Sequence, residues 1–431
     1  MKFCFFLGIL FFATAADAAD GVALNLEQAR QLALKHNPRI TAAELQSLAA
    51  RESITEARAA YFPTITANAT AVGTSQDNTR IAAGSLSNPG IFERNAEGVA
   101  VSQLITDFGR TGNLTASAKL RSSAEQAGLE TVREQVVLLT DTAYFEALRA
   151  ASVLDVAKQT LVTRQTLLDQ VSALASNKLK SELDVNFARV ATDEARILML
   201  QSESELHAAH ARLAMLTGLD QSSVFLLRDV ATNIFSLPDV SKVISEALER
   251  RPELRQLELT AQAARKLAKA ERASGHPTLS AIGGAGVIPL HDSHFEDYYA
   301  AGGVNLSVPI FAGGLYSARA KEAQYKADAN EELLQARREE VARDIRIASL
   351  VVNTAAERIK VAERLVNNAN ETYSLAEAKY SIGSASIVEL SQAQLSKTLA
   401  QIEAATARYN YQIQLSNFNF QAGTVAPAHK S

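Results

Sequence analysis

Two long stretches of the chain repeat apolar residues at the alternating three- and four-residue spacing of a heptad seam. In the second half the seam consists of Ile345, Ala348, Val352, Ala355, Ile359, Ala362, Val366, Ala369, Tyr373, Ala376 and Tyr380. In the first half, 205 residues earlier, it consists of Ala143, Ala147, Ala150, Leu154, Ala157, Leu161, Leu168, Val171 and Ala175, with Arg164 interrupting it. Alanine side chains bury little area in each contact, and burial contributes about 25 cal/mol per Å². The pattern therefore favours helices with neighbours on both sides, as in a cylinder of helices.

A second pattern, alternation with a period of two, predicts strands. Four segments carry it, at about 62–73, 97–107, 277–288 and 300–310. In the last of them, Val304, Leu306, Val308 and Ile310 share one face. Within each segment the alternation extends over about 9–11 residues, the length at which a tilted strand crosses a bilayer. A soluble hairpin with one wet face would alternate in the same way, so this pattern leaves both interpretations open.

These elements occur twice, in the same order. Pro38 and Pro63 are 25 residues apart, as are Pro252 and Pro277, at an offset of 214, and beyond about residue 102 the offset is 205. The difference falls in a polar stretch at about 74–96, which is interpreted as a loop. Each half is expected to contain a first helix, two strands and two long helices joined by a turn. The first helices are predicted at about 26–61 and 240–274.

The duplication also predicts the domain boundaries. The first repeat is expected over 20–220, with its hairpin turn at about 173–184, and the second over 240–420, with its turn at about 380–388. A linker at 221–239 joins the two repeats, and a tail at 421–431 ends the chain.

The N-terminal segment resembles a secretory signal peptide, predicted over 1–19. Lys2 precedes an apolar run that ends near Ala16, and Ala16, Asp17 and Ala18 offer a small-x-small cleavage site. The alternative is a retained N-terminal helix. Cys4 is the only cysteine, so a processed chain would have neither a disulfide nor a thiol nucleophile. No other stretch approaches 18 consecutive apolar residues, so entry into a membrane would require strands closed into a barrel.

Composition and charge exclude several classes of protein. Hydrophobic residues make up 47% and charged residues 21% of the chain, which is not typical of a disordered protein. The net charge is -4 and the two signs alternate, so no basic face for nucleic acid is expected. His207 and His210, three apart on a helix, have no third ligand in view and are expected on a wet face. We expect no cofactor, no metal site and no enzymatic activity.

Neither the sheet nor the helical seam is complete in one copy. Four strands cannot close a barrel, because even small membrane barrels have about eight strands. Open sheet edges are not tolerated in lipid. Both deficits disappear if several copies contribute to one closed cylinder. Three copies of four strands would supply the twelve needed for an open bore.

The ordered motifs resemble those of the TolC family of outer-membrane efflux proteins over essentially the whole mature chain. The motifs are LEQA to NP at 26–38, ITDFGR at 105–110, LDV at 183–185, PIFAGG at 309–314, and KYSIG with IVEL at 379–390. The resemblance implies a mixed α/β membrane protein, a homotrimer with a 12-stranded antiparallel β-barrel continued by a 12-helix coiled-coil α-barrel. It also implies location in outer-membrane lipid, with a periplasmic helical extension. The implied partners are a periplasmic adaptor and an inner-membrane pump of the RND, ABC or MFS type.

The resemblance also implies a periplasmic gate near the hairpin turns. By motif match, Asp184 and Tyr380 stand at positions that form a link between helices, and Glu389 stands at an acidic ring position. Three carboxylates around a narrow axis would attract cations and repel one another. Ala385 and Gln392 stand where the family pattern has a linking Arg and a second carboxylate, which implies a looser gate. The alternatives are a helix N-terminal charge for the two acids and plain packing for Tyr380.

Aromatic residues lie where the predicted strands end. Tyr61, Phe62, Phe108 and Phe311 are expected at the membrane interface next to the helices, and Phe295, Tyr298 and Tyr299 at the opposite end. Ordinary core packing would explain them as well.

The sequence therefore predicts a passive duct for efflux or secretion, with energy supplied by a partner pump. The alternative is an exported coiled-coil scaffold or adhesin with soluble hairpins. The sequence does not name the cargo, which could be drugs, metal ions or proteins.

Overall fold

The computed structural model describes residues 22–73, 79–83, 86–91, 94–291 and 296–424. The predicted signal peptide with Cys4, as well as Phe295 and most of the predicted tail, lie outside these residues. The described chain divides into two compact units. The hairpin unit contains residues 22–40, 133–244 and 344–424, and the strand unit contains the described residues of 41–132 and 245–343.

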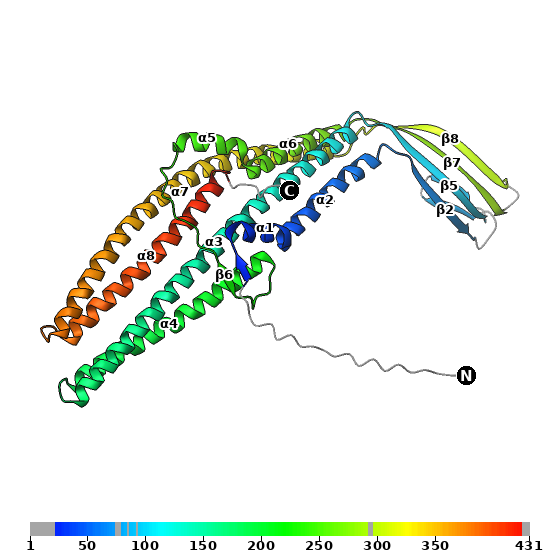
Figure 1. Ribbon diagram of the computed structural model, residues 1–431. Coiled ribbons are helices and arrows are strands. Elements are labelled where there is room, and N and C mark those ends of the chain that lie inside the picture. Colours follow the sequence, from blue (N-terminus) through cyan, green and yellow to red (C-terminus); the bar gives the residue numbers. More distant parts are fainter. Residues whose placement is uncertain (1–21, 74–78, 84–85, 92–93, 292–295, 425–431) are drawn as a thin grey trace, which may run out of the picture. The chain divides into compact units, whose positions relative to one another are not determined.

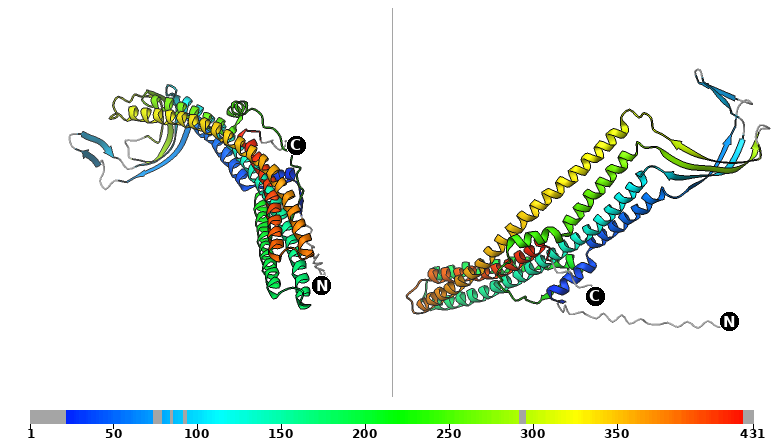
Figure 2. Two further views of the ribbon diagram at one scale, coloured as in Figure 1. Left: turned by 90° about the vertical axis from the view of Figure 1, so that its left-hand side faces the viewer. Right: turned by 90° about the horizontal axis from the view of Figure 1, so that it is seen from above.

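Four long helices build most of the hairpin unit. They are α3 (Arg110–Ser176), α4 (Glu182–Thr217), α7 (Leu315–Ser381) and α8 (Ile387–Gln421), and α3 and α7 begin in the strand unit. Within the hairpin unit the α3–α4 and α7–α8 hairpins run alongside each other, with both turns at the same end (Figures 1 and 2). The turns occupy 177–181 and 382–386, inside the predicted ranges.

The predicted heptad seams are buried. On α7, Ile345, Ala348, Val352, Ala355, Ile359, Ala362 and Ala369 are buried, and Val366, Tyr373, Ala376 and Tyr380 are partly buried. On α3, Ala143, Ala147, Ala150, Leu154, Ala157 and Val171 are buried. Arg164, which interrupts the apolar pattern of α3, lies in the same buried seam. The heptad spacing thus continues through a charged residue.

The first helix of each repeat was predicted as continuous, and this was wrong. The structure has α1 (Leu26–His36) and α2 (Pro38–Ala59) in the first repeat, and α5 (Val240–Arg250) and α6 (Pro252–Ala273) in the second. Each break falls at the residue before a proline. Asn37 and Arg251 have extended backbones, because the proline ring disfavours a helical conformation of the preceding residue. In the described part of the chain, no helix combines the length and apolarity that a transmembrane span requires.

The strand unit contains a four-stranded antiparallel sheet in the order β2-β5-β7-β8 (Figure 2). Its strands are β2 (Thr64–Val72), β5 (Arg94–Thr106), β7 (Thr278–His291) and β8 (Tyr298–Ser307). The predicted extension of the last strand to 310 was wrong. Pro309 has no N–H to donate to a ladder, and β8 ends two residues before it.

The sheet register separates a polar face from an apolar face. On the polar face, Thr64, Thr66 and Asn68 of β2 lie opposite Ser102, Ala100 and Gly98 of β5, and the register places Asn305 of β8 on the same face. On the apolar face, Ile65 lies opposite Val101, and Val304 and Leu306 belong to the same face on β8. The side chains of Ile65, Val101, Val304 and Leu306 are all exposed in one copy of the chain.

Two segments interpreted as a loop and a linker contain strands. β3 (Thr79–Ala83) and β4 (Leu86–Ile91) form an antiparallel pair inside the predicted 74–96 loop, where Gly, Ser and Pro obscured the alternation. β1 (Val22–Leu24) pairs in parallel with β6 (Phe225–Leu227), which lies inside the predicted 221–239 linker. Phe225 of this linker belongs to the core of the hairpin unit, where it packs with Leu24 and Tyr144.

Candidate functional site: the hairpin turns

Both hairpin turns end in the same capping arrangement. Ser181 begins α4, and the Asp184 carboxylate accepts hydrogen bonds from the Ser181 N–H at 3.1 Å and from its hydroxyl at 2.9 Å. Ser386 begins α8, and the Glu389 carboxylate accepts from the Ser386 N–H at 3.0 Å. In each case the serine Oγ accepts from the backbone N–H of the acid, at 3.2 Å. These reciprocal bonds form capping boxes, which satisfy backbone N–H groups that a helix start leaves free.

Tyr380, near the end of α7, has a buried hydroxyl. Within the described residues this hydroxyl has no hydrogen-bond partner. The ammonium group of Lys180 lies 4.5 Å from the centre of the Tyr380 ring. Burial raises the pKa of Tyr380, and the negative charge of Asp184 raises it further. The structure therefore brings Asp184 close enough to act electrostatically on Tyr380.

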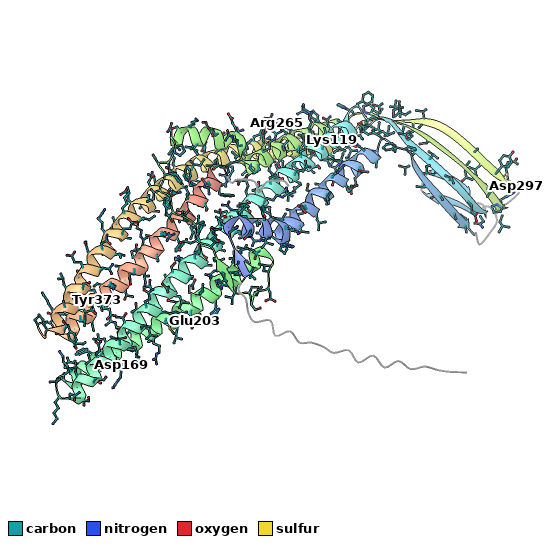
Figure 3. All side chains as sticks on the ribbon, in the orientation of Figure 1. Lys119, Asp169, Glu203, Arg265, Asp297 and Tyr373 are labelled. Atoms are coloured by element: carbon teal, nitrogen blue, oxygen red, sulfur yellow. The ribbon has the colours of Figure 1, made fainter. Side chains whose placement is uncertain are left out.

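A groove of about 830 Å³ lies beside these groups, between α3, α7, α8 and the α3–α4 turn. Its lining includes Leu174, Leu179, Tyr373, Tyr380 and Leu390. Figure 3 shows Tyr373 near the turn end of α7. The Tyr373 hydroxyl donates to a Glu377 carboxylate oxygen at 2.9 Å, and burial raises the pKa of Tyr373 to about 12. The turns thus surround a mostly apolar groove edged by tyrosine hydroxyls.

Arg164, which interrupts the apolar seam of α3, is a buried cation. Its side chain is 6% exposed, and Nη2 donates to the carbonyl oxygen of Ser391 on α8 at 3.0 Å. Within the described residues, Nη1 of Arg164 and the hydroxyl of Ser391 have no partner. Burial lowers the pKa of Arg164, because desolvation disfavours the charged form. A single charged residue within an alanine seam was the available signal, and it could have predicted a charge inside the bundle.

The predicted gate residues are only partly brought together. Asp184 and Tyr380 interact electrostatically, but their carboxylate and hydroxyl form no hydrogen bond among the described contacts. Glu389 is exposed at the start of α8. The link and the acidic ring therefore stay predictions. The structure adds that both acids are capping residues, which agrees with the helix N-terminal alternative.

The aromatic residues next to the helices are exposed in this chain. Tyr61, Phe62 and Phe108 are exposed, and Phe311 is 90% exposed. Core packing within one copy, the alternative interpretation, was therefore wrong for these four residues. Their exposure leaves them available to lipid or to another copy, and their interfacial role stays a prediction.

The histidine pair on α4 was expected on a wet helix face, which was wrong for one member. His207 is exposed, but His210 is buried and its ring meets that of Phe225 edge-on, with centroids 5.5 Å apart. Burial lowers the pKa of His210. The His210 side chain therefore packs α4 against β6.

The order of elements matches a known family along nearly the whole chain. Residues 29–219 and 243–424, more than half of the sequence, match the model described as outer membrane efflux protein. The chain belongs to this family. Its members are channel proteins of the outer membrane, and the predicted fold class, location and role as an efflux channel are confirmed.

Individual relatives agree with this assignment. The outer membrane protein TolC of Escherichia coli (strain K12) is 27% identical over 416 residues, which cover 93% of this chain and 82% of TolC. A membrane protein from Pseudomonas aeruginosa has the same fold, with a TM-score of 0.80 at 24% identity over 92% of this chain and 93% of that one. CusC superposes with a TM-score of 0.79 at 18% identity, over 92% and 91%. Nothing in these comparisons favours an exported scaffold or adhesin.

Proposed function

We propose that this efflux protein works as a homotrimer that forms the passive exit duct of a tripartite efflux or type I secretion system. Three copies join their four-stranded sheets edge to edge in the outer membrane. Their helical hairpins complete a periplasmic cylinder around the same axis. Substrate enters from an inner-membrane pump through a periplasmic adaptor, and the pump supplies the energy.

The observation that carries this proposal is the pair of open sheet edges. In the described sheet, β2 pairs only with β5 and β8 pairs only with β7. Each outer strand therefore presents a row of backbone groups without ladder partners, which is costly in lipid. Pairing β8 of one copy with β2 of the next satisfies both edges at once and closes the sheet.

The hairpin unit supports the same arrangement through a second apolar stripe on α4. Ala188, Ala191 and Ala195 are buried inside the unit. A separate set of large apolar side chains on the same helix is exposed: Leu183, Phe187, Val190, Ile197 and Leu200. The first four recur at spacings of four, three and seven residues, as in a heptad. A helix with one buried and one exposed seam fits a cylinder in which each hairpin has neighbours on both sides.

The hairpin turns are the proposed gate. Asp184 and Tyr380 are the linking pair, and opening of the turns separates them. The exposed Glu389 carboxylates of three copies form the acidic ring at the constriction. Both acids keep their capping roles in this proposal, because a capping carboxylate still has a free oxygen that can face the axis.

Planar-bilayer recording on the detergent-purified full chain tests the duct. We expect discrete single-channel steps that cations from the periplasmic side block. A periplasmic protein that is soluble without detergent and gives no conductance would instead support the scaffold alternative. Deleting the gene and profiling both drug sensitivity and secreted proteins would assign the cargo and the class of pump.

A further inference from the structure

Tyr299 on β8 lies against two glycines on neighbouring strands. In the sheet register Tyr299 is opposite Gly286 of β7, which is opposite Gly98 of β5. A Cβ atom added to Gly98 would collide with the hydroxyl of Tyr299 and lie 3.0 Å from its Cζ. One added to Gly286 would lie 2.7 Å from Cε1 of Tyr299 and would also collide with the backbone of Glu97 and Gly98. The ring therefore crosses β7 and reaches β5, flat against the sheet, in a slot that only glycine leaves open.

The slot belongs to the polar face of the sheet. The register places Asn68 of β2 beside Gly98, so Asn68, Gly98, Gly286 and Tyr299 form one row across all four strands. The neighbouring residue Tyr298 points to the opposite, apolar face. Tyr298 is 74% exposed and Tyr299 is 42% exposed, as expected when only one ring rests on the sheet.

The row lies at the end of the sheet away from the helices. Tyr298 is the first residue of β8, whereas the helix-proximal pair of the same two strands is Thr278 with Ser307. Figure 3 shows Asp297, the residue before β8, at this distal end. In an outer-membrane barrel that is continued by periplasmic helices, the distal end is the outer mouth.

We propose that Tyr299 is a lumen-lining residue, and that three copies of it form an aromatic collar just inside the outer mouth. This inference rests on the proposed function, because it requires the polar face to surround a lumen. Because Gly98 and Gly286 have no side chains, each Tyr299 ring lies flat against the sheet. The mouth of the channel therefore stays open, and an aromatic surface faces the substrate path. Tyr298 and Tyr299 were both predicted as interfacial anchors. In this proposal Tyr298 faces the lipid and Tyr299 faces the lumen.

Cysteine labelling of the full-length channel tests this placement. Cys4 is the only native cysteine and lies in the predicted signal peptide, so an introduced thiol would be the only one in the processed protein. A hydrophilic methanethiosulfonate reagent is added on the outer side of single channels of Tyr299→Cys and of the matched control Tyr298→Cys. We expect Tyr299→Cys to lose conductance in up to three discrete steps, one per copy, and Tyr298→Cys to keep its conductance.

The outcomes separate this inference from the proposed function. If wild-type protein conducts but Tyr299→Cys takes no label, or takes it without loss of conductance, the collar is wrong and the duct stands. If the wild type does not conduct at all, the duct itself is wrong. Should Tyr299→Cys fail to assemble, Tyr299→Phe and Tyr299→Trp replace it. Phe should then preserve conductance and Trp should lower it, and equal conductance of the two would overturn the collar.

Discussion

Asp184 and Glu389 occupy equivalent positions in the two repeats and make the same local contacts. They are 205 residues apart, as are their capping partners Ser181 and Ser386. The pattern of Ser followed three residues later by an acid at a helix start is a recognised capping signature. It could have been found in the sequence, and it means that a gate experiment must separate the charge of each acid from its capping role.

Glu389→Gln makes this separation, because glutamine also closes a capping box. We expect Glu389→Gln to weaken cation block of single-channel conductance without a change in thermal midpoint. Glu389→Ala should weaken the block equally and also cost about 0.5–1.5 kcal/mol of stability, because the Ser386 N–H loses the carboxylate that accepts its hydrogen bond while Ser386 still caps the helix. Bilayer recording and thermal unfolding by circular dichroism measure the two effects. Block that stays at the wild-type level in Glu389→Gln would remove Glu389 from the acidic ring.

Arg164 is expected to reduce the stability of the closed bundle. Among the residues that the structure describes, its buried guanidinium has one hydrogen-bond partner, the carbonyl of Ser391, to compensate for desolvation. Replacing buried charges by apolar residues of similar volume is often stabilising by about 1–4 kcal/mol. Arg164→Met should therefore raise the thermal midpoint, whereas Arg358→Met, at the exposed Arg358–Glu403 pair, should change it little. A lower midpoint for Arg164→Met would mean that the bond to Ser391 outweighs desolvation.

The raised pKa of Tyr144 predicts that the folded protein loses stability at alkaline pH. Its buried hydroxyl donates toward the carbonyls of Arg228, at 2.6 Å, and Leu24, at 3.1 Å. Burial raises the pKa of Tyr144 to about 12, above the unfolded value of about 10. The folded state then holds its proton while the unfolded state loses it, so this contribution is complete below about pH 10 and is lost as pH rises toward 12.

The measurement is the thermal midpoint of wild type and Tyr144→Phe at several pH values. The variant should be less stable at neutral pH because its hydrogen bonds are missing. It should also lose less stability than wild type between pH 10 and 12. Parallel losses in both proteins would show that Tyr144 does not cause the alkaline limit.

At the scale of elements, the regular patterns predicted most of the fold. The heptad seams, the hairpin turns and the four sheet strands were visible because burial on one side repeats at fixed spacing. The helix breaks at Asn37 and Arg251 were missed even though each precedes a proline. The ion pairs between elements could not be predicted, since they join residues far apart in sequence and no local pattern marks them.

One such pair attaches α1 to α3. Arg30 donates from Nε and Nη2 to the two carboxylate oxygens of the buried Asp141, at 2.6 and 2.7 Å. Removing one partner of a buried pair typically costs about 3–5 kcal/mol. Since Arg30 is only half-buried, we expect the lower end for Asp141→Ala. Glu403→Ala, at the exposed Arg358 pair, should cost less than about 1 kcal/mol.

Chemical denaturation, combined with amide exchange on α1, measures this difference. Loss of exchange protection confined to α1 and its contacts would agree with a local anchor. Equal costs for Asp141→Ala and Glu403→Ala would contradict the proposed importance of burial at this pair.

At the scale of the whole molecule, the family could be recognised from the order of motifs in the duplicated chain. The contacts that form the gate could not be predicted from the order of motifs. Its acidic ring depends on contacts between copies, and a single chain displays only the electrostatic effect of Asp184 on Tyr380 and the capping roles of Asp184 and Glu389. The same is true of the collar, because the polar face becomes a lumen only after the sheet has closed.

In the proposed trimer, copies of the chain close one another's sheets and helical seams. Native mass spectrometry of the protein extracted from outer membrane with detergent measures whether they do. We expect a complex of three copies that persists in detergent, with no stable folded monomer at the same concentration. A folded monomer, or a stoichiometry other than three, would contradict the proposed trimer.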